Sequence, residues 1–206
     1  MKSLAHIFQR NRIWAQQHLE SDLDYFKRLA SLQSPEYLWI GCADSRVPAN
    51  VITGLEPGEV FVHCNIANLV SAADMNCMAV LQFAIEHLGI RHVIVCGHYG
   101  CGGVKAALEG VTHGFVDYWL EPIQAIARDE ASQLREVNCQ RTRINRLCEL
   151  NVRAQVRNVA NTPVVRQAWA RGDAVAIHSW IYDISDGLLR DLQCDQMLGF
   201  RADTPV

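Results

Sequence analysis

Apolar and polar residues follow helical and strand periods along most of the chain, beginning with two helical patterns. Apolar residues recur at helical spacing over residues 4–19, and the segment "SDLD" then places Ser21 and Asp24 three positions apart, as at a helix start. This second helix is expected to run to about residue 30. Because no strand pattern precedes them, we predict that the two helices form an arm packed on something other than a sheet of their own.

Short apolar runs alternate with helical patterns in the rest of the chain. Buried strands are expected over residues 36–42, 59–64, 91–97 and 173–184, the last as one strand or two. Helices are expected over residues 74–89, 102–108 and 115–160, the last with breaks near Glu121-Pro122 and Asn138. The dipeptide Asp186-Gly187 marks a turn before "LLRDL". This order predicts an α/β fold with a mainly parallel central sheet of four to five strands flanked by helices.

Composition and charge favour a globular cytoplasmic protein without a nucleic-acid partner. The chain has 206 residues, half of them apolar and a fifth charged, with a formal net charge of −3. This length suits one domain with a sizeable core or two small ones. The basic cluster "QRTRINR" at 140–146 has no aromatic residues between its charges, so we expect no nucleic-acid partner. Neither a signal peptide nor a membrane-length apolar run is recognisable, which favours a cytoplasmic protein.

Two of the predicted strands end in residues that bind metals. Cys42 closes the first strand, and His98 and Cys101 lie three positions apart in a Gly-rich turn after the third. Parallel sheets place their ligands at the carboxyl ends of the strands. Two thiolates and one imidazole suit zinc, and three protein ligands are typical of a catalytic site. Among eight cysteines in a reducing compartment, these are therefore candidate ligands rather than disulfide partners.

Other interpretations of the same segments are weaker. The turn "GHYGCGG" has neither the Gly-Lys-Ser/Thr of a phosphate-binding loop nor the spacing of a dinucleotide-binding loop. His63 and Cys64 lie next to each other on a strand, so their side chains alternate between faces and cannot easily share an ion. Asp44 and Arg46, two apart beside Cys42, can form a charge-assisted pair next to the candidate metal.

The motif Cys42-Ala43-Asp44-Ser45-Arg46, together with "HYGCGG" from His98 to Gly103, resembles the β-class carbonic anhydrases in their bacterial form. The segments "LEPGEVFVHCNIANLV", "CELNV" and "DGLLRDL" extend the resemblance over nearly the whole chain. It implies one zinc per chain held by Cys42, His98 and Cys101, and reversible hydration of CO₂ to bicarbonate and a proton. Asp44 would orient the attacking hydroxide, and Arg46 would hold Asp44 away from the metal.

The resemblance also implies how substrate is bound and how chains assemble. Phe61, Ile66 and Phe83 match positions of an apolar CO₂ pocket, and Gly102 would offer a backbone N–H to bicarbonate. Gln33 matches a residue whose amide reaches the site across a subunit interface. The family builds homodimers or tetramers, so residues 1–206 are expected to form a single domain with its arm, residues 1–30, packed on a partner subunit.

A second pocket is expected to be degraded. Part of the bacterial family uses a Trp, an Arg and a Tyr to hold a regulatory bicarbonate away from the metal. Trp39 and Tyr182 match the Trp and the Tyr of this pocket, but Cys64 occupies the position of the Arg. Since a guanidinium supplies charge-assisted hydrogen bonds that a thiol cannot, we predict weak or absent bicarbonate regulation.

Two alternatives share the same metal ligands. One is a related zinc hydrolase acting on a CO₂ analogue such as CS₂, and the other is a non-catalytic zinc protein. The presence of both Asp44 and Arg46 argues against the second, because a structural site needs no such pair. Zn²⁺ with two thiolates and a neutral imidazole is formally neutral and should acidify water less than a three-histidine site. Activity is therefore expected to rise above neutral pH.

Overall fold

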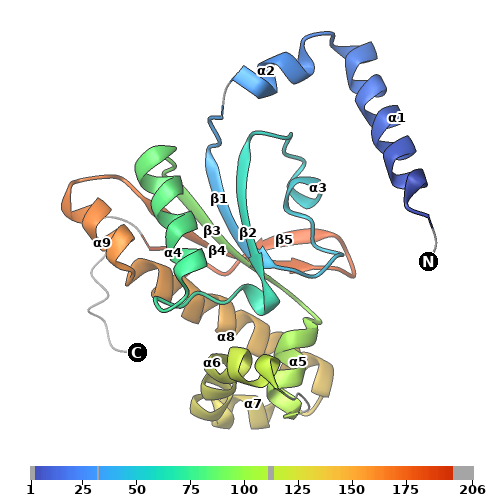
Figure 1. Ribbon diagram of the computed structural model, residues 1–206. Coiled ribbons are helices and arrows are strands. Elements are labelled where there is room, and N and C mark those ends of the chain that lie inside the picture. The colour runs from blue at the N-terminus through green and yellow to red at the C-terminus, as the bar shows by residue number, and fades with distance from the viewer. Residues whose placement is uncertain (1–2, 32, 111–113, 197–206) are drawn as a thin grey trace. The chain divides into compact units, whose positions relative to one another are not determined.

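The computed structural model describes residues 3–31, 33–110 and 114–196, in two compact units, Met1–Ser34 and Pro35–Val206 (Figure 1). The first unit contains helices α1 (Ala5–Ser21) and α2 (Tyr25–Ser31), as the periodicity predicts. Within this unit the His18 ring stacks on Tyr25, and Trp14 meets Phe26 edge-on with 5.6 Å between ring centroids. The apolar side chains Leu4, Ile7, Phe8, Ile13 and Leu19 are exposed. The arm therefore has aromatic contacts but little core of its own.

The second unit is built on a five-stranded sheet of order β2-β1-β3-β4-β5. Strands β1 (Tyr37–Cys42), β2 (Val60–Asn65), β3 (His92–His98) and β4 (Ala176–Asp183) are parallel. Strand β5 (Leu188–Asp191) pairs antiparallel with β4 after the predicted turn, where Gly187 has a φ of 75°. The predicted α/β class and mainly parallel sheet are confirmed.

Helices surround this sheet and connect its strands. They are α3 (Ala49–Thr53), α4 (Met75–Gln82), α5 (Gly102–Glu109), α6 (Phe115–Asp129), α7 (Ala131–Glu136), α8 (Gln140–Ala160) and α9 (Pro163–Ala170). A 3₁₀ turn, η1 (Ile66–Asn68), follows β2, and a π-helical turn, η2 (Phe83–His87), extends α4. None of the described helices is long and apolar enough to cross a membrane.

The predicted break at Glu121-Pro122 is wrong, because α6 continues through Pro122. Proline removes one hydrogen bond from a helix interior, but packing on either side can outweigh that loss. Leu120 and Ile123 flank the proline and are fully buried in the main core. The break expected near Asn138 is confirmed, since α7 ends at Glu136 and α8 begins at Gln140.

The main core lies between α8 and one face of the sheet. Helix α8 packs against β3 and β4 (Figure 1), where Val152 and Val156 join Val93 and Val95 in one buried cluster. A smaller cluster on the opposite sheet face is centred on Trp39. Because β1 and β3 are neighbouring parallel strands, their carboxyl ends meet at one edge of the sheet. The strand ends that carry the candidate ligands are thus brought together by the sheet itself.

Candidate metal centre

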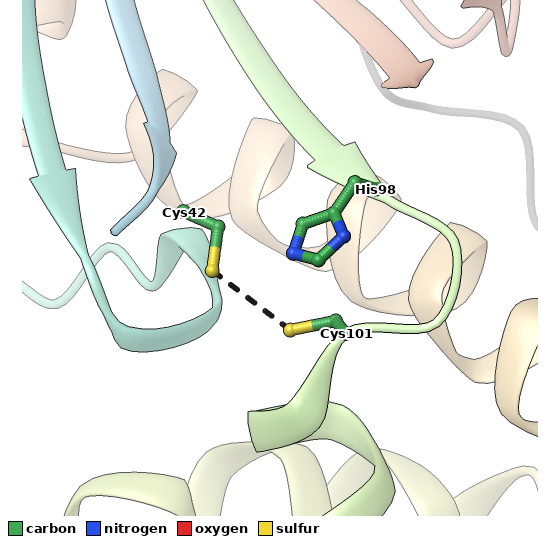
Figure 2. A group of neighbouring side chains, drawn as sticks. All are labelled: Cys42, His98 and Cys101. Carbon is green, nitrogen blue, oxygen red and sulfur yellow. Dashed lines mark hydrogen bonds between the residues drawn. The ribbon is translucent and has the colours of Figure 1, made fainter. Parts of the chain in front are cut away.

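Cys42, His98 and Cys101 converge at this edge of the sheet. Cys42 is the last residue of β1, His98 is the last residue of β3, and Cys101 caps the N-terminus of α5. Figure 2 shows the three side chains pointing toward one another. Their ligand atoms all lie within 4.8 Å of one another, and the two Sγ atoms are 3.9 Å apart. All three residues are buried, so the site is a closed cluster rather than a chance surface grouping.

The orientation of His98 fits a metal ligand. Its Nδ1 lies 3.1 Å from the carbonyl oxygen of Tyr99, which can only accept, so Nδ1 carries the hydrogen. In the neutral ring Nε2 is therefore left with its lone pair. That atom is buried and has no hydrogen-bond partner among the described residues. An orphaned basic nitrogen beside two thiols is a site that a soft divalent cation would satisfy.

The thiols also fit a cation between them. The hydrogen bond from Cys101 lowers the pKa of Cys42 to about 4, in opposition to burial. The same contact, together with burial, raises the pKa of Cys101. One thiolate forms readily and the second is opposed by the first. A positive ion bound to both would remove that opposition, and the two-sulfur, one-nitrogen set suits zinc.

Asp44 stands beside the ligands in a fixed orientation. Its Oδ1 accepts from the Arg46 backbone N–H at 3.0 Å and from Nε at 2.9 Å, and its Oδ2 accepts from Nη2 at 2.6 Å. Hydrogen bonding to Arg46 holds the pKa of Asp44 well below its usual range. Oδ2 lies 3.7 Å from His98 Nε2. An ionised carboxylate with both oxygens engaged by Arg46 therefore borders the metal position.

Comparison with known families agrees with this geometry. A sequence model of the family described as carbonic anhydrase matches residues 37–189, which include all three ligands and the Asp44–Arg46 pair. The chain belongs to the carbonic anhydrase family. The carbonic anhydrase of Emericella nidulans is 46% identical over 92% of this chain and 83% of its own length. That of Pseudomonas aeruginosa is 33% identical over 87% of this chain and 80% of its own.

Solved structures place this chain in the β class of the family. The Coccomyxa β-carbonic anhydrase, solved with acetazolamide, is 40% identical with a TM-score of 0.89, over 93% of this chain and 87% of that one. A tetrameric β-carbonic anhydrase from Sordaria macrospora is 39% identical with a TM-score of 0.89, over 93% of this chain and 98% of that one. The expected bacterial form finds no support, since the fungal relative is more similar than the Pseudomonas protein.

The residues expected to bind CO₂ or bicarbonate lie at separate places in the structure. Phe61 and Phe83 lie together, with 5.9 Å between ring centroids, and Phe83 is 43% exposed. Ile66 follows β2, is 46% exposed, and lies beside the start of α5. A Cβ added to Gly102 would meet no atom within 4 Å, so space is open there. Gln33 is an exposed residue of the other compact unit.

The residues matched to the regulatory pocket lie on the opposite face of the sheet. Trp39 is fully buried, its Nε1 has no partner among the described residues, and its indole lies over Gly41. Tyr182 packs in the same small cluster. Cys64 pairs in register with Gly41 and is exposed. The thiol supplies no positive charge at its position beside the indole.

Several residues that border the metal centre were missed from the sequence. Ala67 is buried in the same cluster as Cys42, and Asn151 of α8 donates to the Ala67 carbonyl. A signal was present in α8, where Asn151, Gln155 and Asn158 interrupt an otherwise apolar helical face at one-turn spacing. Amides in such positions need buried partners.

Proposed function

We propose that the chain catalyses the reversible hydration of CO₂ to bicarbonate and a proton, with one zinc held by Cys42, His98 and Cys101. The observation that carries the proposal is the buried Nε2 of His98, which faces two thiols and has no hydrogen-bond partner within the part of the chain that the structure describes. Zinc, when bound, would supply a Lewis acid that lowers the pKa of a water molecule and so turns it into a nucleophile. Family membership supports the same reaction.

Asp44 is the proposed orienting group. Because the Arg46 contacts keep it ionised, Asp44 can only accept a hydrogen bond. It would accept a hydrogen bond from the attacking nucleophile and so leave a lone pair free to meet the carbon of CO₂. Arg46 is a positioning residue in this scheme. It occupies both carboxylate oxygens, and this restrains Asp44 from becoming a metal ligand itself.

CO₂ binding is assigned to apolar contacts, because CO₂ carries no charge with which a charged side chain could pair. Ile66 directly follows β2 and supplies apolar surface at the carboxyl edge of the sheet, whereas Phe61 is in register with Leu38 near the amino end of β1 and packs on Phe83. Phe83 and Ile66 are partly exposed in the single chain. The backbone N–H of Gly102, in the first turn of α5, is the proposed donor to bicarbonate. Gln33 is proposed to contribute its amide to the site of a partner subunit.

Self-association to a homodimer or tetramer is part of the proposal. Exposed apolar side chains in α1 and at Val62 and Phe83 are surfaces that a second copy could cover. The Sordaria relative is described as tetrameric. Residues 1–206 would then act as one domain whose arm, residues 1–30, packs on the partner. A cytoplasmic location is proposed because the two ligand cysteines must stay reduced, and all eight cysteines are free.

The substrate is tested by assaying zinc-loaded protein in parallel with CO₂ and CS₂. Stopped-flow hydration of CO₂ should exceed the buffer rate at about pH 8.5, where a weakly acidified water is ionised. Hydrolysis of CS₂ without hydration of CO₂ would reassign the site to the analogue. The Asp44→Asn variant keeps the shape of the site and should be strongly impaired with either substrate.

A further inference from the structure

Two histidines and an aspartate form a hydrogen-bonded chain near the amino end of β3. His92 is the first residue of β3, and Ile94, two residues further on, pairs in register with His178 of β4. Alternate residues of a strand point to one face, and residues paired in register share a face, so both imidazoles lie on the same side of the sheet. His98 ends the same strand, so at about 3.3 Å per residue the pair lies roughly 20 Å from the metal centre.

The carboxylate of Asp195 fixes which nitrogen of His178 carries the hydrogen. Asp195 Oδ2 lies 2.9 Å from His178 Nδ1. Because a carboxylate can only accept, Nδ1 is the donor, and in the neutral ring the lone pair is left on Nε2. Histidines that bind metals typically have this arrangement, in which a carboxylate holds the other ring nitrogen. The Nε2 of His178 is therefore a prepared ligand atom.

Asp195 is itself held in place by Ser179. Its Oδ1 accepts from the Ser179 backbone N–H at 3.0 Å and from the Ser179 hydroxyl at 3.1 Å. The same hydroxyl oxygen accepts from the backbone N–H of Cys194 at 3.0 Å. Ser179 is fully buried, so the carboxylate that orients His178 is fixed from below by the interior of the protein. The contact between Asp195 and His178 is thus not a chance meeting of two free surface side chains.

His92 brings a second ring nitrogen to the lone pair of His178. Its Nδ1 lies 3.0 Å from His178 Nε2, whereas the ring centroids are 5.3 Å apart, so the two nitrogens face each other between the rings. Since His178 Nε2 accepts, His92 Nδ1 supplies the hydrogen between them. Zinc–nitrogen bonds of about 2.0–2.1 Å separate two nitrogens on one ion by about 3.0–3.4 Å. The two imidazoles therefore already have the spacing of two ligands of one ion.

A divalent cation can take the place of the hydrogen between the rings. The His92 side chain is exposed, so its ring can tilt until both lone pairs point at one ion. The neutral His92 ring then carries its hydrogen on Nε2 instead of Nδ1, and no proton is lost overall. Imidazole suits zinc, nickel and copper, and water completes the coordination at an exposed site.

We propose that His92 and His178 form a second metal site, which binds a divalent cation of the zinc, nickel and copper class, with Asp195 as the positioning residue for His178. A bound cation would join β3 to β4 and, through Asp195, to the segment after β5. The buried cluster of Cys42, His98 and Cys101 offers three ligands instead of two, so it fills first. The second site does not depend on the proposed reaction, because it lies at the other end of the strand.

The test titrates Ni²⁺ into full-length, zinc-loaded protein that carries no histidine tag, and follows binding by calorimetry. Wild type should bind one Ni²⁺ per chain while it retains its zinc. His178→Gln should lose this binding, and Asp195→Asn, which keeps the shape of the carboxylate, should weaken it by about 10–100-fold. The matched control His87→Ala removes an exposed histidine elsewhere and should bind Ni²⁺ as wild type does.

A second readout locates the ion. Anomalous diffraction at the nickel edge should show a peak between the rings of His92 and His178, and a peak elsewhere would overturn the proposal. So would wild type that binds no Ni²⁺, or equal binding by wild type and His178→Gln. If His178→Gln or Asp195→Asn does not fold, His92→Ala removes one ligand at an exposed position and is judged by the same comparison. Failure of the proposed reaction would appear separately, as Ni²⁺ binding in a zinc-loaded protein that does not hydrate CO₂.

Discussion

The guanidinium of Arg46 engages both carboxylate oxygens of Asp44, with Nε 2.9 Å from Oδ1 and Nη2 2.6 Å from Oδ2. Replacing Arg46 with Ala should release the carboxylate toward the metal position and lower kcat/KM for CO₂ by about 10–100-fold, as for other groups that orient a metal site. The matched control is Arg190→Ala, which removes an exposed Arg–Asp pair with Asp186. Equal activity of Arg46→Ala and wild type would contradict the role given to Arg46.

The imidazole of His98 should be essential for holding zinc. Replacing His98 with Ala removes the one nitrogen ligand, so zinc affinity should fall by more than the roughly 10–100-fold lost with outer partners. Zinc per chain, measured after dialysis against a weak chelator, should drop well below that of wild type. His92→Ala, at the opposite end of the same strand and exposed, should retain its zinc. Retention of full zinc by His98→Ala would refute the ligand assignment.

Activity should rise with pH from about 6 to 9, because the neutral ligand set acidifies water less than a cationic one. Asp44 should contribute no part of this rise. Hydrogen bonding to Arg46 depresses the pKa of Asp44, so its carboxylate is ionised throughout that range, and its contribution to stability is lost only as the pH falls toward that depressed value. A flat pH–rate profile would count against the proposed charge of the site.

Bicarbonate should inhibit the wild-type protein weakly and without cooperativity. Cys64 lies beside Trp39 without a cation, so an anion at that place has no charge-assisted partner there. Cys64→Arg should introduce bicarbonate inhibition, measured as the rate against bicarbonate concentration. The control Cys139→Arg adds the same charge at an exposed position before α8. Strong cooperative inhibition of the wild type would disprove this prediction.

The sheet and the metal ligands could be predicted from the sequence because both depend on local pattern. Apolar runs gave β1, β2 and β3 to within one or two residues, and parallel strands bring Cys42 and His98 to one edge whatever lies between them. Helix α9 was missed although Thr162 and Pro163 form an N-terminal start, in which the Thr162 side chain accepts from the Val165 N–H.

The surroundings of the metal ligands depend on tertiary contacts that local patterns do not encode. Pro122 signals a break, but burial of its neighbours keeps α6 continuous. The sequence does not predict the left-handed conformation of Ala67. The Ala67 carbonyl accepts a hydrogen bond from Asn151, which belongs to a helix far away in the sequence. The ligands are thus readable from the sequence, whereas the groups that orient them require the fold.

The central claim is most directly tested by measuring CO₂ hydration while zinc is added back to metal-free protein. At about pH 8.5 the stopped-flow rate should grow in proportion to bound zinc and level off at one zinc per chain, in keeping with the single Cys42–His98–Cys101 cluster found in the described residues. A chain that holds one zinc and hydrates CO₂ no faster than buffer would contradict the account.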